Sequence, residues 1–185
     1  MYNSALKGFL EQRPEIDMVT EYKCKHGVAF VWDILQGVSE EFLKADCMYS
    51  ELPYPMGQKI FNKNANKECN HVEILKKANE IIHALKIPTV IITSKTAKKY
   101  FTDCECKKTK AAHGVEVWGY AFYGAEVKDT FSKTLQQFIE SKNCILDICC
   151  GYGNTGKAFA VDGRKYIMTD YDPYCISVIK QTILT

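Results

Sequence analysis

The residues best suited to chemistry lie near the carboxyl end of the chain. An apolar run at residues 144–146 leads into Asp147, and the glycines Gly151, Gly153 and Gly156 follow. Glycines let a backbone turn tightly and approach a ligand closely, and a helix that follows them offers free N–H groups and partial positive charge. This stretch is therefore a candidate ligand-binding turn.

A second acid strengthens that interpretation. The apolar segment 165–169 is followed by Asp170, after a helix-like segment that begins at Lys157. Strand, glycine-rich turn, helix, strand and acid make up the nucleotide-binding half of a doubly wound sheet, in which the acid accepts hydrogen bonds from ribose hydroxyls. A glycine-rich turn alone also occurs in strand-to-helix connections without a ligand, so Asp170 supplies much of the specificity.

The two segments that carry this pattern are Leu146-Asp-Ile-Cys-Cys-Gly-Tyr-Gly-Asn-Thr-Gly156 and Gly163-Arg-Lys-Tyr-Ile-Met-Thr-Asp-Tyr-Asp-Pro173. They resemble the first two motifs of S-adenosylmethionine-dependent methyltransferases, above all those that methylate exocyclic amines of DNA bases (adenine-N(6) or cytosine-N(4) type). The resemblance implies S-adenosyl-L-methionine as the cofactor. Its methionine end would lie at Asp147 and the glycines Gly151 and Gly153, and its ribose at Asp170, with Cys149 lining the pocket.

A segment far upstream is similar to the catalytic signature of the same enzymes, which is Asp or Asn, then Pro-Pro and an aromatic residue at the end of a strand. Here Glu51-Leu52-Pro53-Tyr54 follows a short apolar strand. The resemblance implies that Glu51 and the carbonyl of Leu52 accept hydrogen bonds from the target amine, while Tyr54 stacks on the extruded base. The alternative is that these residues form only a turn.

The chemistry accounts for these residue types. An aromatic amine is a poor nucleophile because its lone pair is delocalised, and two acceptors localise that pair toward the methyl group. The remaining work is alignment, and no metal is needed. Glu51 is one methylene longer than the family's acid, and Leu52 replaces a proline and would hold the turn less rigidly. Misplacement by about 1 Å can cost on the order of a hundredfold in rate.

The order of the motifs is also informative. Trp32-Asp33 resembles the family's acid on the adenine side of the cofactor, so the catalytic half precedes the cofactor half. This is the circularly permuted order of many such enzymes. We expect a single domain over residues 1–185, with a catalytic half at about 21–130 and a cofactor-binding half at about 131–185.

The periodicity of apolar residues predicts the elements that position these motifs. An α/β fold follows, namely a class I methyltransferase (Rossmann-like) fold with three layers and a mostly parallel sheet with an antiparallel edge strand. Residues 95–110 are expected to be a lysine-rich connection, and 115–123 the antiparallel edge strand. The other predicted strands are 27–32, 46–50, 89–93, 144–146 and 165–169, and the predicted helices are 34–44, 69–85, 129–140 and one from 157.

Composition limits the choice of partner. The net charge is +2 over 185 residues, and the only arginines are Arg13 and Arg164. Arginine is the side chain that most often recognises guanine edges in a duplex. With only two arginines, this chain alone is poorly suited to sequence-specific recognition of duplex DNA. Residues 93–131 also leave no room for a target-recognition insert. We therefore expect the substrate to be single-stranded nucleic acid, or a duplex that a partner helps to recognise. The protein could then act as a homo- or hetero-oligomer. A nucleotide or small molecule is the alternative substrate.

Other signals are weaker. Nine cysteines are expected to stay reduced, and the absence of a leader or long apolar run predicts a cytoplasmic protein without membrane contact. Cys104, Cys106 and His113 lack the second ligand pair of a zinc site, so no metal is expected. Cys69 and His71 are expected to cap a helix or face solvent. The lysines of residues 95–110 form either a solvated face or a surface that binds a nucleic-acid backbone.

The sequence therefore predicts a methyltransferase that acts on an exocyclic amine of a DNA base, with adenine favoured. Two alternatives remain, since the catalytic motif departs from the family pattern. One is an inactive, methyltransferase-like binding or scaffold subunit, and the other is a small-molecule methyltransferase.

Overall fold

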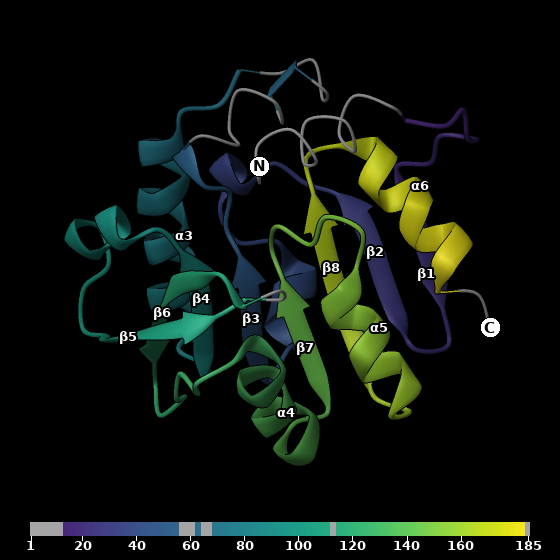
Figure 1. Cartoon of the computed structure of the whole chain (residues 1–185). Coiled ribbons are helices and arrows are strands. Elements are labelled where there is room, and N and C mark those ends of the chain that lie inside the picture. Colours follow the sequence, from purple (N-terminus) through teal and green to yellow (C-terminus); the bar gives the residue numbers. More distant parts are fainter. Residues whose placement is uncertain (1–12, 56–61, 64–67, 112–113, 184–185) are drawn as a thin grey trace.

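The computed structural model describes residues 13–55, 62–63, 68–111 and 114–183 (Figure 1). Within them, eight strands form one sheet in the order β1-β2-β8-β7-β3-β4-β6-β5. Strands β2, β8, β7, β3 and β4 run parallel, whereas β1 and β6 are antiparallel to their neighbours. The bounds are β1 Glu21–Cys24, β2 Gly27–Val31, β3 Cys47–Glu51, β4 Thr89–Thr93, β5 Glu105–Lys110, β6 Glu116–Phe122, β7 Cys144–Asp147 and β8 Lys165–Asp170.

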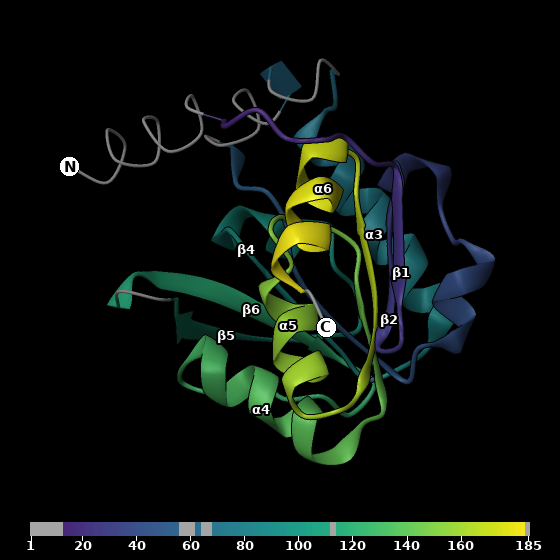
Figure 2. The ribbon, with the colours of Figure 1, turned by 90° about the vertical axis from the view of Figure 1, so that its right-hand side faces the viewer.

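Helices cover both faces of the sheet, as the sequence predicted (Figure 2). On one face lie α3 (His71–Leu85) and the 3-10 helices η1 (Ile34–Gln36) and η2 (Glu40–Lys44). On the other lie α4 (Phe131–Ser141), α5 (Asn154–Val161) and α6 (Pro173–Thr182). The mostly parallel, three-layer α/β fold is therefore confirmed.

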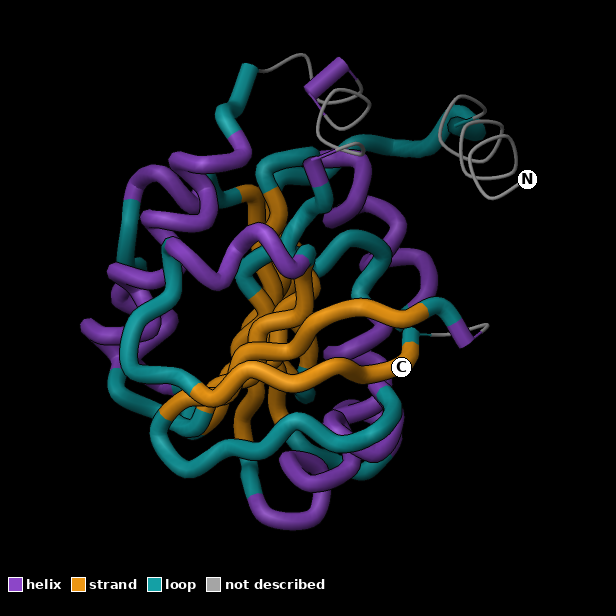
Figure 3. The backbone as a smooth tube through the Cα atoms, turned by 60° about the vertical axis from the view of Figure 1, so that its left-hand side comes forward, coloured by secondary structure: helices purple, strands orange, loops and turns teal. Residues whose placement is uncertain are grey.

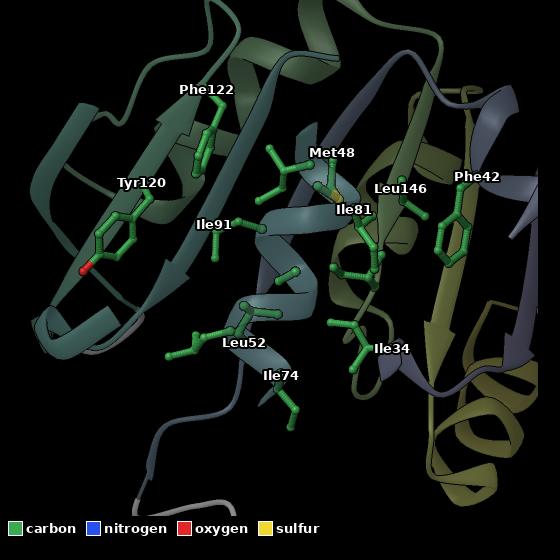
Figure 4. Packing of buried hydrophobic residues seen from close by; sticks show 14 of the residues in the cluster. Ile34, Phe42, Met48, Leu52, Ile74, Ile81, Ile91, Tyr120, Phe122 and Leu146 are labelled. Atoms are coloured by element: carbon green, nitrogen blue, oxygen red, sulfur yellow. The ribbon is translucent and has the colours of Figure 1, made fainter. Parts of the chain in front are cut away.

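Two apolar clusters, one on each side of the sheet, hold the layers together. Helix α3 buries the stripe Ile74, Leu75, Ala78, Ile81 and Ile82, whose spacing places them on one helical face. Figure 4 shows members of this cluster, including Leu52, between α3 and the strands. Central strands are apolar on both sides, because helices cover both faces.

Several predicted elements are wrong. Residues 34–44 do not form one helix, because Gly37 adopts φ 83° between η1 and η2. Residues 95–110 are not merely a connection but contain η3 (Lys95–Lys99) and β5. Consequently β6 is antiparallel as predicted but is not the edge strand, since β5 lies outside it.

The α5 helix begins at Asn154, earlier than predicted, with Gly153 as its N-cap. Strand β1 and helix α6 were not predicted. All nine cysteines are free. No helix in the described part of the chain is long and apolar enough to span a membrane.

Candidate functional site

The predicted site residues gather at one edge of the sheet. Because β2, β8, β7 and β3 are neighbouring parallel strands, their carboxyl ends meet there, which is where open α/β sheets bind ligands. Val31 pairs with Asp170, so Asp33 leaves β2 beside the end of β8. Figure 1 shows the glycine turn at this edge, where β7 leads into α5.

The glycine turn has one open position and one crowded position. Gly151 and Gly153 both adopt positive φ, at 49° and 78°. A Cβ added to Gly151 would have no atom within 4 Å, whereas one on Gly153 would lie 2.7 Å from Cγ1 of Ile179. Gly151 therefore faces open space at the site, while Gly153 is needed for packing against α6.

Asp170 joins this turn to β8. Its carboxylate accepts hydrogen bonds from the backbone N–H groups of Gly151 and Asp172, both at 3.0 Å. Burial raises the pKa of Asp170 to about 7, although these two bonds favour the charged form. Since each carboxylate oxygen accepts a single bond here, lone pairs remain for a ligand's hydroxyl groups.

Asp147 joins the turn to the strand that carries the predicted catalytic motif. It is 3% exposed and accepts a hydrogen bond of 2.9 Å from the hydroxyl of Ser50. That hydroxyl in turn accepts the N–H of Ile148 at 2.8 Å. Burial raises the pKa of Asp147 to about 6, and its bonds to Thr155 and Ser50 oppose the rise. Because Ser50 immediately precedes Glu51, this hydrogen bond holds the predicted catalytic motif beside the start of the glycine turn.

Glu51 ends β3 with an exposed side chain, yet its surroundings remove enough water to raise the pKa of its carboxyl group. The hydroxyl of Tyr54 donates to Oε1 of Glu51 at 3.4 Å, which opposes that rise. Both side chains belong to the predicted catalytic motif, so the structure brings an acid and an aromatic ring together. Pro53 between them is partly buried.

Leu52 is anchored more firmly than its sequence context suggested. Its side chain is 0% exposed, within the cluster under α3 (Figure 4). Its backbone N–H donates to the carbonyl of Ile92 at 2.9 Å and so extends the β3–β4 pairing. A proline has no N–H and could not make this bond. Leucine in place of proline is therefore consistent with a well-fixed turn.

Cys149 lies close to the acids that are predicted to bind the cofactor. Burial, followed by the charges of Asp170 and Asp147 and more weakly Asp33, raises the pKa of its thiol well above the usual value. Cys149 is thus an uncharged residue near Asp170, Asp147 and Asp33. Asp33 also accepts the N–H of Leu35 at 3.0 Å and caps η1.

Tyr171 was missed by sequence reasoning, and the burial of the His71 ring nitrogens was not expected. The hydroxyl of Tyr171 and both ring nitrogens of His71 are buried without a hydrogen-bond partner. Burial, Asp170 and then Cys69 and Cys149 raise the pKa of Tyr171, which places it beside the acids. Tyr171 could have been found from its position directly after Asp170.

The expectation that Cys69 and His71 cap a helix or face solvent is wrong. Asn70 caps α3 instead, and Cys69 is buried. Within the part of the chain that the structure describes, no group of three or more His, Cys, Asp or Glu side chains could hold a metal ion. His113 and residues 56–61 lie outside the described residues.

Comparisons with known proteins support the α/β fold described above. Neither a protein-family model nor a curated protein matches the sequence. Among solved structures, M1.HpyAVI is similar with a TM-score of 0.54 at 14% identity, over 84% of this chain and 97% of that one. Its complex with SAM gives 0.52 at 12% identity, over 83% and 98%. The cytosine-N4-specific PvuII DNA methyltransferase gives 0.53 at 11% identity, over 85% and 86%. The chain thus has the Rossmann-like fold of these DNA methyltransferases.

Proposed function

We propose that this protein is an S-adenosylmethionine-dependent methyltransferase that acts on an exocyclic amine of a DNA base, with adenine favoured. The observation that carries the proposal is the Ser50–Asp147 hydrogen bond of 2.9 Å. It couples the strand that ends in Glu51 to the strand that enters the glycine turn. The similarity to DNA methyltransferases, one of them solved with SAM, supports the same conclusion.

The residues at the turn fit this cofactor. Gly151 faces open space, and Asp170 has free lone pairs for ribose hydroxyls. The hydroxyl of Tyr171, the residue after Asp170, is a buried polar atom without a partner. We propose that Asp170 holds the ribose, that Asp33 and Cys149 line the adenosine side, and that Gly151 and Gly153 shape the methionine side. Asp147, which accepts hydrogen bonds from the Ser50 hydroxyl and the Cys149 N–H, positions the turn.

The bound cofactor would supply a methyl group on a sulfonium, which is already a good leaving group. Glu51 and the Leu52 carbonyl would then accept the two amine hydrogens and direct the nitrogen lone pair toward that methyl group. Methyl transfer would leave the bonding electrons on the cofactor's sulfur, and the methylated amine would carry one surplus proton. Glu51, whose pKa is raised, is placed to take the surplus proton. Tyr54 would stack on the base.

The motif order supports the circularly permuted arrangement as part of this proposal. The strand that enters the glycine turn, β7, is late in the chain but lies next to β3, and β8 lies between β7 and β2. Residues 21–130 would thus form the catalytic half and 131–185 the cofactor half of one domain. Base delivery would use a single strand, or a duplex with help from another subunit or partner.

The test is transfer of a tritiated methyl group to single-stranded DNA, duplex DNA and RNA in parallel, with oligonucleotides that contain only adenine or only cytosine as acceptor base. We expect transfer to adenine-containing DNA that Glu51→Gln abolishes with cofactor affinity nearly unchanged. Tyr54→Ala should lose stacking worth about 1–3 kcal/mol per base. Glu51→Asp should retain activity, because it restores the family's shorter acid.

Glu105→Gln is a matched control, since Glu105 is an exposed acid on β5 away from the motif, and it should not change activity. Cofactor binding without transfer to any nucleic acid would contradict base methylation and favour the scaffold alternative. Transfer only to small amines would favour the small-molecule alternative.

A further inference from the structure

Five exposed lysines from two separate segments gather beside the candidate site. Lys95, Lys98 and Lys99 lie on η3, which follows β4, and Lys108 and Lys110 lie on β5. We name this set the lysine face. The sequence left open whether these residues are only a solvated surface, and their arrangement in the fold decides between the two interpretations.

The fold brings the two segments to the same side of the sheet. Side chains alternate along a strand, so Lys108 and Lys110 share a side with Cys106. Trp118 on β6 is the cross-strand partner of Lys108, and the Lys95 ammonium lies over the Trp118 ring, so η3 lies over that side. Figure 3 brings this edge of the sheet forward.

Most of these charges are not neutralised. Lys108 pairs with Glu116 at 3.0 Å. Among the described residues, Lys95, Lys98, Lys99 and Lys110 form no ion pair. Counting Glu116 and nearby Asp103 against the five lysines leaves a net charge of +3 on this face.

Two lysines are oriented by aromatic rings instead of by acids. The Lys95 ammonium lies 5.2 Å from the centre of the Trp118 ring, and that of Lys99 lies 4.9 Å from the centre of Tyr100. A cation–π contact orients a charge without cancelling it. The lysine face therefore remains a positive surface that an anion can approach.

The backbone under the lysines is well fixed. The hydroxyl of Tyr120, a residue that is 0% exposed, donates to the carbonyls of Ser94 and Lys95 at 2.9 and 3.2 Å. Ser94 is the N-cap residue of η3. A partner would thus meet a preorganised surface and lose little entropy in ordering it.

The lysine face lies next to the predicted catalytic loop. Leu52 bonds to Ile92 on the neighbouring strand, and Lys95 follows Ile92 by three residues. Strand spacing and rise place the start of the lysine face on the order of 10 Å from Glu51. A chain of phosphates across it would reach the carboxyl edge of the sheet, where Glu51 ends β3.

We propose that the lysine face binds the phosphate backbone of a DNA single strand and directs one of its bases toward Glu51. This inference rests on the proposed function and adds the form in which the substrate arrives. A single strand suits this surface better than a duplex, because neither arginine is free to read base edges. Arg13 pairs with Asp172, and Arg164 bonds Asp162 and the carbonyl of Lys142.

The test measures fluorescence anisotropy of a labelled single-stranded oligonucleotide over a range of salt concentrations. The variant Lys98→Glu/Lys110→Glu reverses two lysines that form no ion pair and lie over no aromatic ring, although Lys110 is the cross-strand neighbour of Glu116. The control Lys165→Glu/Lys180→Glu makes the same change in net charge at exposed positions on β8 and α6. Calorimetry with S-adenosylhomocysteine on both variants reports whether the cofactor site is intact.

We expect at least tenfold weaker DNA binding in the first variant and less than threefold in the control, with cofactor affinity unchanged in both. The dependence of log affinity on log salt should fall by about 1.4 for the two lost contacts. Equal losses in both variants, or tighter binding of duplex than of single strand by the native protein, would overturn the inference. Lysine-dependent binding without methyl transfer would leave it standing and refute only the proposed function.

Discussion

Leu52→Pro separates an expectation based on the family motif from one based on the structure. The motif has proline at this position, so the substitution looks like a repair. In the structure it removes the 2.9 Å bond from the Leu52 N–H to the carbonyl of Ile92, and leaves that carbonyl unpaired at a cost of about 1–3 kcal/mol. Proline also has one carbon fewer in a site that is 0% exposed, which costs about 1 kcal/mol more.

The expected loss is therefore about 2–4 kcal/mol, or a melting temperature roughly 5–15 °C lower at this chain length. Urea unfolding followed by circular dichroism measures it directly. Leu52→Met is the matched control, since it keeps the N–H and nearly the same volume and should cost less than about 1.5 kcal/mol. If Leu52→Pro were as stable as the native protein, the hydrogen bond would not anchor the turn as we argue.

Three further predictions follow from the site. Gly151→Ala should weaken S-adenosylhomocysteine binding more than it lowers stability. Gly153→Ala should mainly destabilise the fold, because its Cβ would clash with Ile179. Calorimetry measures the binding and thermal unfolding the stability of each variant. Ser50→Ala should cost about 1–3 kcal/mol in urea unfolding, because ionised Asp147 loses a buried donor, and a smaller loss at pH 8 than at pH 5 would count against this. With the pKa of Asp170 at about 7, cofactor affinity should rise about tenfold from pH 6 to pH 8, and Asp170→Asn should remove that dependence.

The sequence predicted those parts of the fold that local patterns encode. The strand Thr89–Thr93 was correct to the residue, because a continuous apolar run bounded by Pro88 reads as a buried strand. The spacing of apolar residues also predicted α3. The glycine turn and Asp170 came from the pattern of strand, glycine-rich turn, helix and acid, whereas the Glu51 motif came from a resemblance to known enzymes. The structure places all three at one edge of the sheet.

What the sequence could not predict depends on tertiary contacts. Strand β5 has the burial pattern of an exposed edge and is rich in lysine, so only its pairing with β6 makes it a strand. The anchoring of Leu52 depends on a carbonyl 40 positions later in the chain. The burial of the Tyr171 hydroxyl and of the His71 ring nitrogens without partners likewise depends on the folded chain around them.

The buried acids show why such a site favours an occupant. The pKa of Asp170 is raised from 3.8 to about 7, so the native state holds its proton where the unfolded chain has released it. The free energy of unfolding therefore falls as pH rises from about 4 to 7, and this cost remains at neutral pH. A ligand that donates hydroxyl hydrogens and carries positive charge stabilises the ionised carboxylate and recovers that free energy on binding. The burial that makes ionised Asp170 unfavourable thereby favours binding of a cationic nucleoside.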